Sequence, residues 1–501
     1  MKAMPFIEKL QHWAKTAGAR PAVTVGAQRL DYASLLAAAE APETLVSAEP
    51  GAGTSVTVSA PGPSCGPVAV IDVPASVDVA VQFCAALRQH KTAMVVDTSW
   101  PQELRKQLAE TAQSWATTQD AIDPPFLLGL SSGTSGLPKA FTRSTATWHE
   151  SFIRSTDYFG LTAETVTFAP GPMAASMNLY ALGESIFAGG SFVALPDFSP
   201  DAALAAVSAN HVNRLVLVPT VLELLARRGV ATGQLAPVIS SIVCAGSALS
   251  SATAALAQQW APNAVIHQYY GAAELGFVAA TTLEPGAVLE ESDGVGRAFP
   301  GVQLSIRNGQ GRGVDTGKLG SVCVKSPYVC SGYAWGDDGL AFSTHGIDGW
   351  YTVHDQGRLD EHGKLRLAGR ASDMILISGA NVYPHAVEQA LRRNSNGGSS
   401  GDSSSGTEMD VIVAGLPDPV RGHRVIAAFR PAAPYSDAHR SSTSPDALAL
   451  LRAGAAELPA SHRPSQYYEL AELPLTGSGK ISRALLTQWI VEGDPRVQRR
   501  S

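Results

Sequence analysis

The most informative stretch of this sequence is Leu130-Ser131-Ser132-Gly133-Thr134-Ser135-Gly136-Leu137-Pro138-Lys139, which directly follows a predicted strand at Phe126–Leu130. Its glycines and hydroxyl side chains allow backbone N–H and side-chain O–H groups to converge on an anion, and Lys139 adds a positive charge. It is not a Walker A loop, because Pro138 stands where that motif needs the glycine before its lysine. The stretch predicts a phosphate-binding loop; the alternative is a solvated loop between a strand and a helix.

Around this loop, short apolar runs alternate with longer helical stretches. Strands are predicted at Val68–Val73, Ala93–Val96, Phe126–Leu130, Val166–Ala169, Phe192–Leu195, Leu215–Val218, Ile242–Ala245 and Val265–Gln268, and helices at Ser76–Gln89, Ala202–Asn210, Val221–Arg228 and Ala252–Trp260. This alternation predicts parallel sheets covered by helices. After about Gly294 the pattern favours antiparallel strands, for example at Leu304–Arg307 and Ser321–Lys325.

The second half of the chain predicts a further domain. Beyond Gly369-Arg370 come strands at Met374–Ser378, Asp410–Gly415 and Val425–Arg430 and helices at Pro384–Arg393 and Asp446–Glu457. We therefore expect an α/β protein with a large N-terminal domain (residues 1–369), which includes a small β-barrel-like antiparallel subdomain, and a small mobile α+β C-terminal domain (residues 370–501). Residues 394–407 are almost entirely Ser, Gly and Asn, which predicts a flexible loop.

Composition narrows the classes of function. The 501 residues are 45% hydrophobic. The 37 basic and 44 acidic residues give a net charge of -7, so the overall charge does not favour binding to nucleic acid or to an anionic membrane. The five cysteines form no C-x-x-C pair and suggest buried thiols of a reducing compartment. Because no uninterrupted apolar run reaches the ~18 residues of a membrane span, and the N-terminus gives no export signal, a cytoplasmic protein is expected.

Three further motifs bear groups suited to catalysis. The first, Pro474–Arg483, contains Gly477-Ser478-Gly479-Lys480. The second, Tyr269-Tyr270-Gly271-Ala272-Ala273-Glu274, ends in an acid. The third is Trp350–Asp355, which is followed by Gly369-Arg370. Taken singly, these have ordinary structural interpretations: an exposed turn, a helix cap or Mg²⁺ ligand, and a surface ion pair.

Together, the order and spacing of the four motifs resemble the adenylate-forming superfamily of acyl-CoA synthetases, adenylation domains and luciferases. The resemblance extends from about Phe6 to Leu486, and Ser378–Pro384 with Glu388 is most similar to the acyl-CoA synthetase branch. It implies an AMP-forming acid–thiol ligase that uses ATP, Mg²⁺ and coenzyme A. A carboxylate attacking the α-phosphate brings two anions together, so this chemistry needs positioning and positive charge rather than a protein nucleophile.

The resemblance also implies a role for individual residues. Lys480, Glu274 and Thr134 would be catalytic, with Glu274 as the Mg²⁺ acid, Ser372 as the hinge and Gly379 in the CoA tunnel. Asp355 would accept the ribose hydroxyls, and Arg370 would approach the ribose or phosphate. The remaining residues implied for ATP and AMP are Ser131, Ser132, Gly133, Thr134, Ser135, Gly136, Lys139, Gly246, Ser247, Ala248, Tyr269, Tyr270, Gly271 and Ala272.

The sequence departs from the family pattern at several positions. Ala273 replaces the usual Ser/Thr before the acid, His354 replaces the glycine of Thr-Gly-Asp, and Ser372 stands where Asp or Lys is common. The effect of these changes on rate is left open.

The substrate is expected to be apolar. Amino-acid-activating members place an Asp in the segment matching Pro170–Met177, which here is small and apolar, and a buried ammonium without a partner would be costly. The predicted acyl pocket consists of Met173, Met177, Cys244, Ala245 and Phe277. We expect a fatty, aryl or polycyclic acid, with CoA as the acceptor; the alternatives are a ligase that loads a carrier protein's phosphopantetheine, and a nucleotide-binding homologue without turnover.

Overall fold

The computed structural model describes residues 4–40, 68–118, 125–131, 137–290, 294–337, 339, 341–345, 348–370, 373–377, 380–393, 409–418, 422–431, 447–476 and 481–500. The chain forms two compact units, each built from separate segments. The first comprises Met1–Ser305, Cys323–Val353 and Gly363–Leu365, and the second comprises Ile306–Val322, His354–His362 and Arg366–Ser501. The predicted division at Gly369 is simpler than this arrangement, because between Ile306 and Arg366 successive segments of the chain belong alternately to the second and the first unit.

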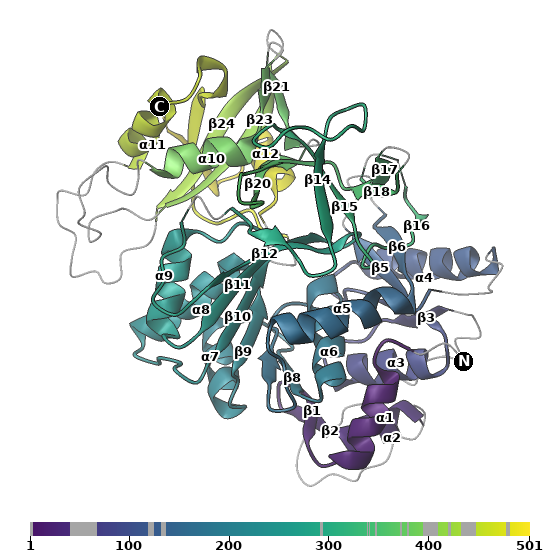
Figure 1. Cartoon of the computed structure of the whole chain (residues 1–501). Coiled ribbons are helices and arrows are strands. Elements are labelled where there is room, and N and C mark those ends of the chain that lie inside the picture. The colour runs from purple at the N-terminus through teal and green to yellow at the C-terminus, as the bar shows by residue number, and fades with distance from the viewer. Residues whose placement is uncertain are drawn as a thin grey trace. The chain divides into compact units, whose positions relative to one another are not determined.

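A nine-stranded sheet forms the centre of the first unit, in the order β13-β12-β11-β10-β9-β7-β8-β1-β2 (Figure 1). The six strands from β11 to β1 are parallel to one another, and the pairs at both ends of the sheet are antiparallel. The strands are β1 (Pro21–Val25), β2 (Gln28–Asp31), β7 (Val166–Phe168), β8 (Ser191–Ala194), β9 (Arg214–Leu217), β10 (Ser241–Ala245), β11 (Val265–Ala272), β12 (Gly276–Leu283) and β13 (Arg297–Ala298).

Three helices cover one face of this sheet and bury a large apolar core. They are α7 (Pro200–Ala209), α8 (Pro219–Ala231) and α9 (Ser251–Trp260), and they pack Leu204, Leu225 and Trp260 against the strands. Local sequence determines where two of them begin: the N–H of Ala202 donates to the Ser199 hydroxyl (3.2 Å), and the N–H of Thr253 donates to that of Ser250 (3.0 Å). The other helices of the unit are α1 (Ile7–Thr16), α2 (Tyr32–Glu40), α3 (Val77–Arg88), α4 (Gln102–Thr117), α5 (Thr145–Tyr158) and α6 (Ser176–Ala188).

A second sheet of the first unit has the order β16-β6-β5-β4-β3. Its strands are β3 (Val68–Ile71), β4 (Thr92–Val95), β5 (Leu127–Ser131), β6 (Lys139–Arg143) and β16 (Tyr333–Trp335). The first three strands are parallel, whereas β5–β6 and β6–β16 are antiparallel. The Ser/Gly-rich loop therefore connects two antiparallel strands, and the alternative interpretation of a loop between a strand and a helix was wrong about the following element. The remaining strands, β17 (Ser343–His345) and β18 (Trp350–Thr352), pair with each other.

The second unit combines β-ribbons with a helix-covered sheet. Strand β15 (Gly320–Lys325) is divided between the units: Gly320 and Ser321 pair with β19 (Asp355–Leu359) in the second unit, and Val324 pairs with β18 within the first. The main sheet has the order β22-β21-β24-β25-β26, and β23 also pairs with β24. The strands of this sheet and the helices around it are β21 (Ile375–Ile377), β22 (Ala380–Val382), α10 (Pro384–Arg393), β23 (Met409–Asp418), β24 (Gly422–Pro431), α11 (Ala447–Ala456), a 3₁₀ turn (Ala460–His462), β25 (Gln466–Leu470), α12 (Arg483–Glu492) and β26 (Val497–Arg500). Strands β14 (Gln303–Arg307) and β20 (Leu365–Arg370) belong to a separate sheet, β17-β18-β15-β19-β20, in which β14 pairs with β15.

These elements confirm the predicted α/β class, with antiparallel strands after Gly294 and an α+β arrangement at the C-terminal end. Residues 394–407, predicted as a loop, lie outside the described residues, as does Cys65, whereas Cys84, Cys244, Cys323 and Cys330 are buried free thiols. Among the described helices, none has the length and apolar character needed to cross a membrane.

Candidate active site

In the first unit, the parallel strands bring several predicted segments to one edge of the large sheet. Because β7, β9, β10 and β11 run in the same direction, their carboxyl ends lie at the same edge, which is where ligands bind in open α/β sheets. Residues 169–177 follow β7, and Gly246, Ser247 and Ala248 follow β10 as an exposed turn. The sheet therefore places the predicted acyl segment and the predicted adenine segment at the same edge, at the ends of two strands that are separated by β9.

Strand β11 is longer than the sequence predicted. It continues past Gln268 to Ala272 and pairs antiparallel with β12, with a register shift between Tyr270 and Gly271. At Gly271 an added Cβ would lie 2.4 Å from the carbonyl oxygen of Gly276, so a side chain cannot be accommodated without a shift of the backbone. The short turn after β11 contains Glu274, which the extended strand thereby holds at the sheet edge.

Neighbouring elements fix both the backbone and the side chain of this turn. The N–H of Cys330 donates to the carbonyl of Glu274 (2.7 Å), and the buried guanidinium of Arg143 donates to the carbonyl of Ala273 (2.5 Å). The Tyr333 hydroxyl donates to Oε1 of Glu274 (2.7 Å). Among the described residues, no hydrogen bond reaches the other carboxylate oxygen, Oε2.

Lys139, at the end of the Ser/Gly-rich loop, lies beside the same tyrosine. Its Nζ is 5.9 Å from the centre of the Tyr333 ring, and the lysine itself is buried. Ser131 pairs directly with Lys139 across β5 and β6, so the two ends of the predicted phosphate loop meet. The intervening residues, Ser132, Gly133, Thr134, Ser135 and Gly136, lie outside the described residues. The structure thus brings Glu274 and Lys139 together through Tyr333.

This arrangement suits a magnesium ion held mainly by substrate. Among the described residues, no group of three or more His, Cys, Asp or Glu side chains could hold a metal. Mg²⁺ is commonly bound by one or two carboxylates together with substrate phosphates and water. The half-buried Glu274 carboxylate, whose Oε2 accepts no hydrogen bond from a described residue, fits that pattern.

The predicted acyl pocket is distributed over two faces of the sheet. Met173 is buried, and Met177 is the second residue of α6. Cys244 belongs to the core beneath α7–α9, whereas its neighbour Ala245 points to the opposite face because successive strand residues alternate. The ring of Phe277 lies 4.7 Å from that of Tyr269. Tyr269, Ala245 and Phe277 can therefore contribute to one lining, to which the side chain of Cys244 does not belong.

A buried aromatic cluster that the sequence analysis did not identify lies beside Phe277. Phe299 stacks on Phe277 at 4.4 Å, and Tyr180 of α6 contacts it at 5.4 Å. The Tyr180 hydroxyl is hydrogen-bonded to Ser151 (2.7 Å) and Ser155 (2.9 Å), and burial raises its pKa well above its usual value. The environment of Phe277 is therefore largely apolar, and the hydroxyl groups in it are neutral.

The remaining predicted residues belong to the second unit or lie outside the described residues. Asp355 is buried at the start of β19, and the preceding His354 has a left-handed backbone (φ 61°), the conformation for which glycine is favoured. The departure from Thr-Gly-Asp therefore keeps the backbone geometry of a glycine. Arg370 is the last residue of β20. Ser372, Gly379 and Lys480 lie outside the described residues.

The segments on either side of Lys480 are firmly anchored within the second unit. Leu475 pairs with Ile481, and the N–H of Ser482 donates to the carbonyl of Pro474 (2.7 Å). Arg483 donates to Oε1 of buried Glu388 (2.7 Å) and to the carbonyl of Val413 (3.0 Å). Burial would raise the pKa of Glu388, but the charges of Arg483, Arg392 and His385 hold that pKa below its usual value.

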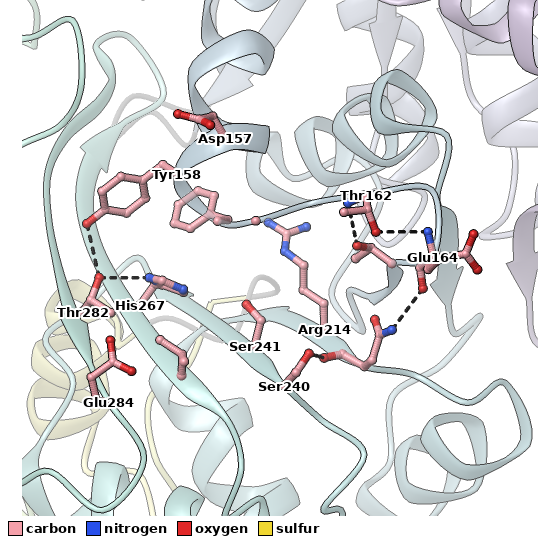
Figure 2. A pocket seen from close by; sticks show the side chains of 15 residues that line it. Asp157, Tyr158, Thr162, Glu164, Arg214, Ser240, Ser241, His267, Thr282 and Glu284 are labelled. Atoms are coloured by element: carbon pink, nitrogen blue, oxygen red, sulfur yellow. Dashed lines mark hydrogen bonds between the residues drawn. The ribbon is translucent and has the colours of Figure 1, made fainter.

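A cavity of about 570 Å³ opens at the other edge of the large sheet, at the amino ends of β9, β10 and β11 (Figure 2). Arg214 lines it and forms a fully buried ion pair with Glu184 (2.8 Å). His267 donates to or accepts from Thr282 (3.1 Å), and burial together with the charge of Arg214 lowers its pKa to about 4. None of the predicted site residues lines this cavity.

Sequence reasoning missed Tyr333 and Arg143, the two residues that hold the Glu274 turn. No local pattern identifies them, since each reaches the turn from a strand distant in sequence: Tyr333 and Glu274 are 59 residues apart, and Arg143 and Ala273 are 130 apart. The pairing of β16 with β6 is the missing information.

Comparison with known proteins identifies one family model and several acyl-CoA ligase relatives. The sequence model of the AMP-binding enzyme family matches residues 63–334. An uncharacterized acyl-CoA ligase of Bacillus subtilis, YhfT, is 30% identical over 388 residues, which are 77% of this chain and 73% of that protein. The indoleacetate–CoA ligase of Aromatoleum aromaticum is 28% identical over 363 residues, 72% of this chain and 66% of that protein.

A solved structure shares the fold over nearly the full length. The o-succinylbenzoate CoA synthetase of Bacillus subtilis (MenE), in complex with its acyl-adenylate intermediate, superposes with a TM-score of 0.72 at 19% identity, covering 97% of this chain and 98% of that one. The same enzyme has also been solved with ATP and magnesium ion. With the family match over more than half of its length and a relative at 30% identity, this chain belongs to the AMP-binding enzyme family, the adenylate-forming superfamily, on its acyl-CoA synthetase branch.

Proposed function

We propose that this enzyme activates an apolar carboxylic acid with Mg-ATP to an acyl-adenylate, and then transfers the acyl group to the thiol of coenzyme A. In the first step a carboxylate oxygen attacks the α-phosphorus and the bond to pyrophosphate breaks. In the second, the CoA sulfur attacks the acyl carbonyl carbon and AMP leaves, with the thiol proton passing to solvent. The observation that best supports this proposal is the Glu274 carboxylate, held by Tyr333 beside Lys139, whose Oε2 has no hydrogen-bond donor in the part of the chain that the structure describes.

The charges at this site suit phosphoryl chemistry. Lys139 places a cation at the end of the Ser131–Lys139 loop, whose hydroxyls and N–H groups would cradle the phosphates. Mg²⁺, when bound by Glu274, would neutralise phosphate charge. Lys480 would bridge the substrate carboxylate and the α-phosphate, and Asp355 would hold the ribose hydroxyls. Gly246–Ala248 and Tyr270 would flank adenine at the end of β10 and β11.

The apolar surroundings favour a substrate without an ammonium group. In residues 170–177 there is no carboxylate, Met173 is buried, and the described side chains around Phe277 are aromatic. The buried carboxylate of Glu184 nearby is already paired with Arg214, so an ammonium buried there would compete with that guanidinium for its counter-charge, which is costly. Fatty, aryl and polycyclic acids remain the substrate classes of this proposal.

Coenzyme A is the proposed acceptor. The similarity to acyl-CoA ligases in sequence supports this choice, and Gly379 would line the path of the thiol. The proposal includes rotation of the C-terminal domain about Ser372 between the two steps, so that Lys480 leaves the site before the thiol enters.

The test is a pyrophosphate-release assay with a panel of fatty, aryl and polycyclic acids, each with and without CoA and Mg²⁺. We expect release that depends on Mg²⁺ and on the acid, and formation of an acyl-CoA. The matched variant is Glu274→Gln, which keeps side-chain size but removes the charge and should weaken the response to Mg²⁺ at unchanged fold. If purified carrier protein consumes the acyl-adenylate and CoA does not, the acceptor assignment is wrong. ATP binding without pyrophosphate release for any acid would contradict the activity itself.

A further inference from the structure

We propose that Tyr333 is a positioning residue for Glu274: its hydroxyl fixes one carboxylate oxygen so that the other faces the metal–phosphate group. The inference rests on the proposed function, which assigns Glu274 to magnesium. Tyr333 was not among the residues that the sequence motifs identified, and its role follows from the contacts described here.

The backbone around Tyr333 is rigidly held. Tyr333 begins the edge strand β16 and pairs with Phe141 of β6. On either side, the N–H of Thr142 donates to the carbonyl of Gly332 (2.8 Å), and the indole N–H of Trp335 donates to the carbonyl of Pro138 (2.9 Å). The phenol therefore belongs to a strand, β16, that is paired with β6, the strand that closes the predicted phosphate loop. Its position changes only if β6 moves.

The side chain of Tyr333 contacts two charged groups of the site at once. One face of its ring lies 5.9 Å from Nζ of Lys139, and its hydroxyl is 2.7 Å from Oε1 of Glu274. One tyrosine therefore contacts both the cation at the end of the predicted phosphate loop and the acid proposed for the metal.

The hydroxyl also limits the rotation of the carboxylate. The terminal torsion of a glutamate is broad and samples many angles unless a partner fixes it. With Oε1 accepting from Tyr333, the lone pairs of Oε2 keep one direction, and a ligand pre-oriented in this way loses less freedom when it binds. Removing the hydroxyl should therefore reduce the linkage between Mg²⁺ and ATP without affecting the binding of ATP alone.

The experiment measures binding in the absence of turnover. The affinity for ATP is determined by titration calorimetry, without an acid substrate, at zero and saturating Mg²⁺, and the ratio of the two dissociation constants gives the enhancement by Mg²⁺. In Tyr333→Phe, which keeps the ring on β16 and beside Lys139, we expect this enhancement to fall about 10-fold, the effect of one hydrogen bond to a charged group. The metal-free dissociation constant should be unchanged, which also shows that the variant is folded.

A neighbouring tyrosine provides the matched control. Tyr351 belongs to β18, and its ring stacks on Phe342, which in turn contacts Tyr333. Tyr351→Phe removes a hydroxyl from the same aromatic group without touching Glu274, and it should leave the enhancement unchanged. An equal loss in both variants would mean that the aromatic group acts as a whole, and would overturn the specific role of Tyr333.

A double variant separates this inference from the proposed function. Once Glu274→Gln has removed the charge, adding Tyr333→Phe should cause no further loss, since the two residues act as one unit. A full additional loss in the double variant would overturn the inference. If Glu274→Gln removes the enhancement and Tyr333→Phe does not alter it, the inference alone is wrong. If Glu274→Gln itself has no effect, the magnesium assignment is wrong.

Discussion

Acidification should destabilise the first unit through His267. This side chain is 7% exposed, and its ring packs against Phe159 at 5.2 Å, near the charge of Arg214. Its pKa falls from 6.5 to about 4 in the folded chain. Between these values the unfolded chain binds more protons, so stability is lost as the pH falls from about 6.5 toward 4.

The size of this effect follows from the shift. A change of about 2.5 pKa units corresponds to about 3.4 kcal/mol when fully expressed below pH 4, and to about 2 kcal/mol at pH 5. In His267→Gln, which keeps a polar group near Thr282 but cannot titrate, the difference in unfolding free energy between pH 7 and pH 5 should shrink by about 2 kcal/mol.

Urea unfolding followed by tryptophan fluorescence measures this difference. All tryptophans except Trp489 belong to the first unit, so the signal reports mainly on the unit that contains His267. The matched control is His211→Asn, a change at an exposed histidine whose left-handed backbone (φ 52°) asparagine tolerates. The same pH dependence in His267→Gln and in the parent protein would refute the assignment of this acid sensitivity to His267.

Three other changes test the remaining charged and strained positions. Glu184→Gln leaves the Arg214 cation buried without its counter-charge and should cost about 3–5 kcal/mol of unfolding free energy, whereas the pair Glu184→Leu with Arg214→Met should recover much of it; equal losses would contradict the pairing argument. His354→Gly relieves a left-handed backbone and should raise the unfolding free energy of the second unit by up to about 1 kcal/mol, which appears as a higher melting temperature. A lower melting temperature would show that the imidazole makes a compensating contact. The lowered pKa of Glu388 means that its stabilising contribution is present above pH 4.5 and is lost as the pH falls below that value. Glu388→Gln should therefore flatten the acid limb of second-unit stability measured by hydrogen exchange, and an unchanged limb would assign the acid transition elsewhere.

Local patterns predicted most of the central elements. The apolar runs at Val68, Ile242 and Val425 lie in strands, and the amphipathic stretches after Ser76, Ser199 and Ser250 form helices whose serines accept N–H groups as caps. The family resemblance implied a role for Glu274, which stays a prediction; the structure places both Glu274 and Lys139 against Tyr333.

The errors concern elements determined by distant partners. Lys139–Arg143 has charged residues at both ends, which do not suggest a strand, yet all five residues are buried because β5 and β16 flank them. The extension of β11 through Tyr269–Ala272 depends on its pairing with β12. Alternation along β10 cannot reveal which of its faces packs against helices, so the place of Cys244 in the core beneath α7–α9 could not be predicted. Tyr333 could not be predicted for the same reason, since only the sheet brings it to Glu274.

The exchange of segments between the two units has a consequence for synthesis on the ribosome. The first unit is complete once Leu365 has emerged, but Ile306–Val322 belongs to the second unit and must wait for the strands of its C-terminal half. At about 5–20 residues per second, the residues after Leu365 take roughly 7–27 s to be made. During that interval Ile306–Val322 and β19 can pair with each other but lack the rest of their unit, which begins at Arg366, and unpaired strand edges favour aggregation. Shortened forms that stop before the last strands should therefore be recovered in poor yield, even though the first unit contains all of its own residues.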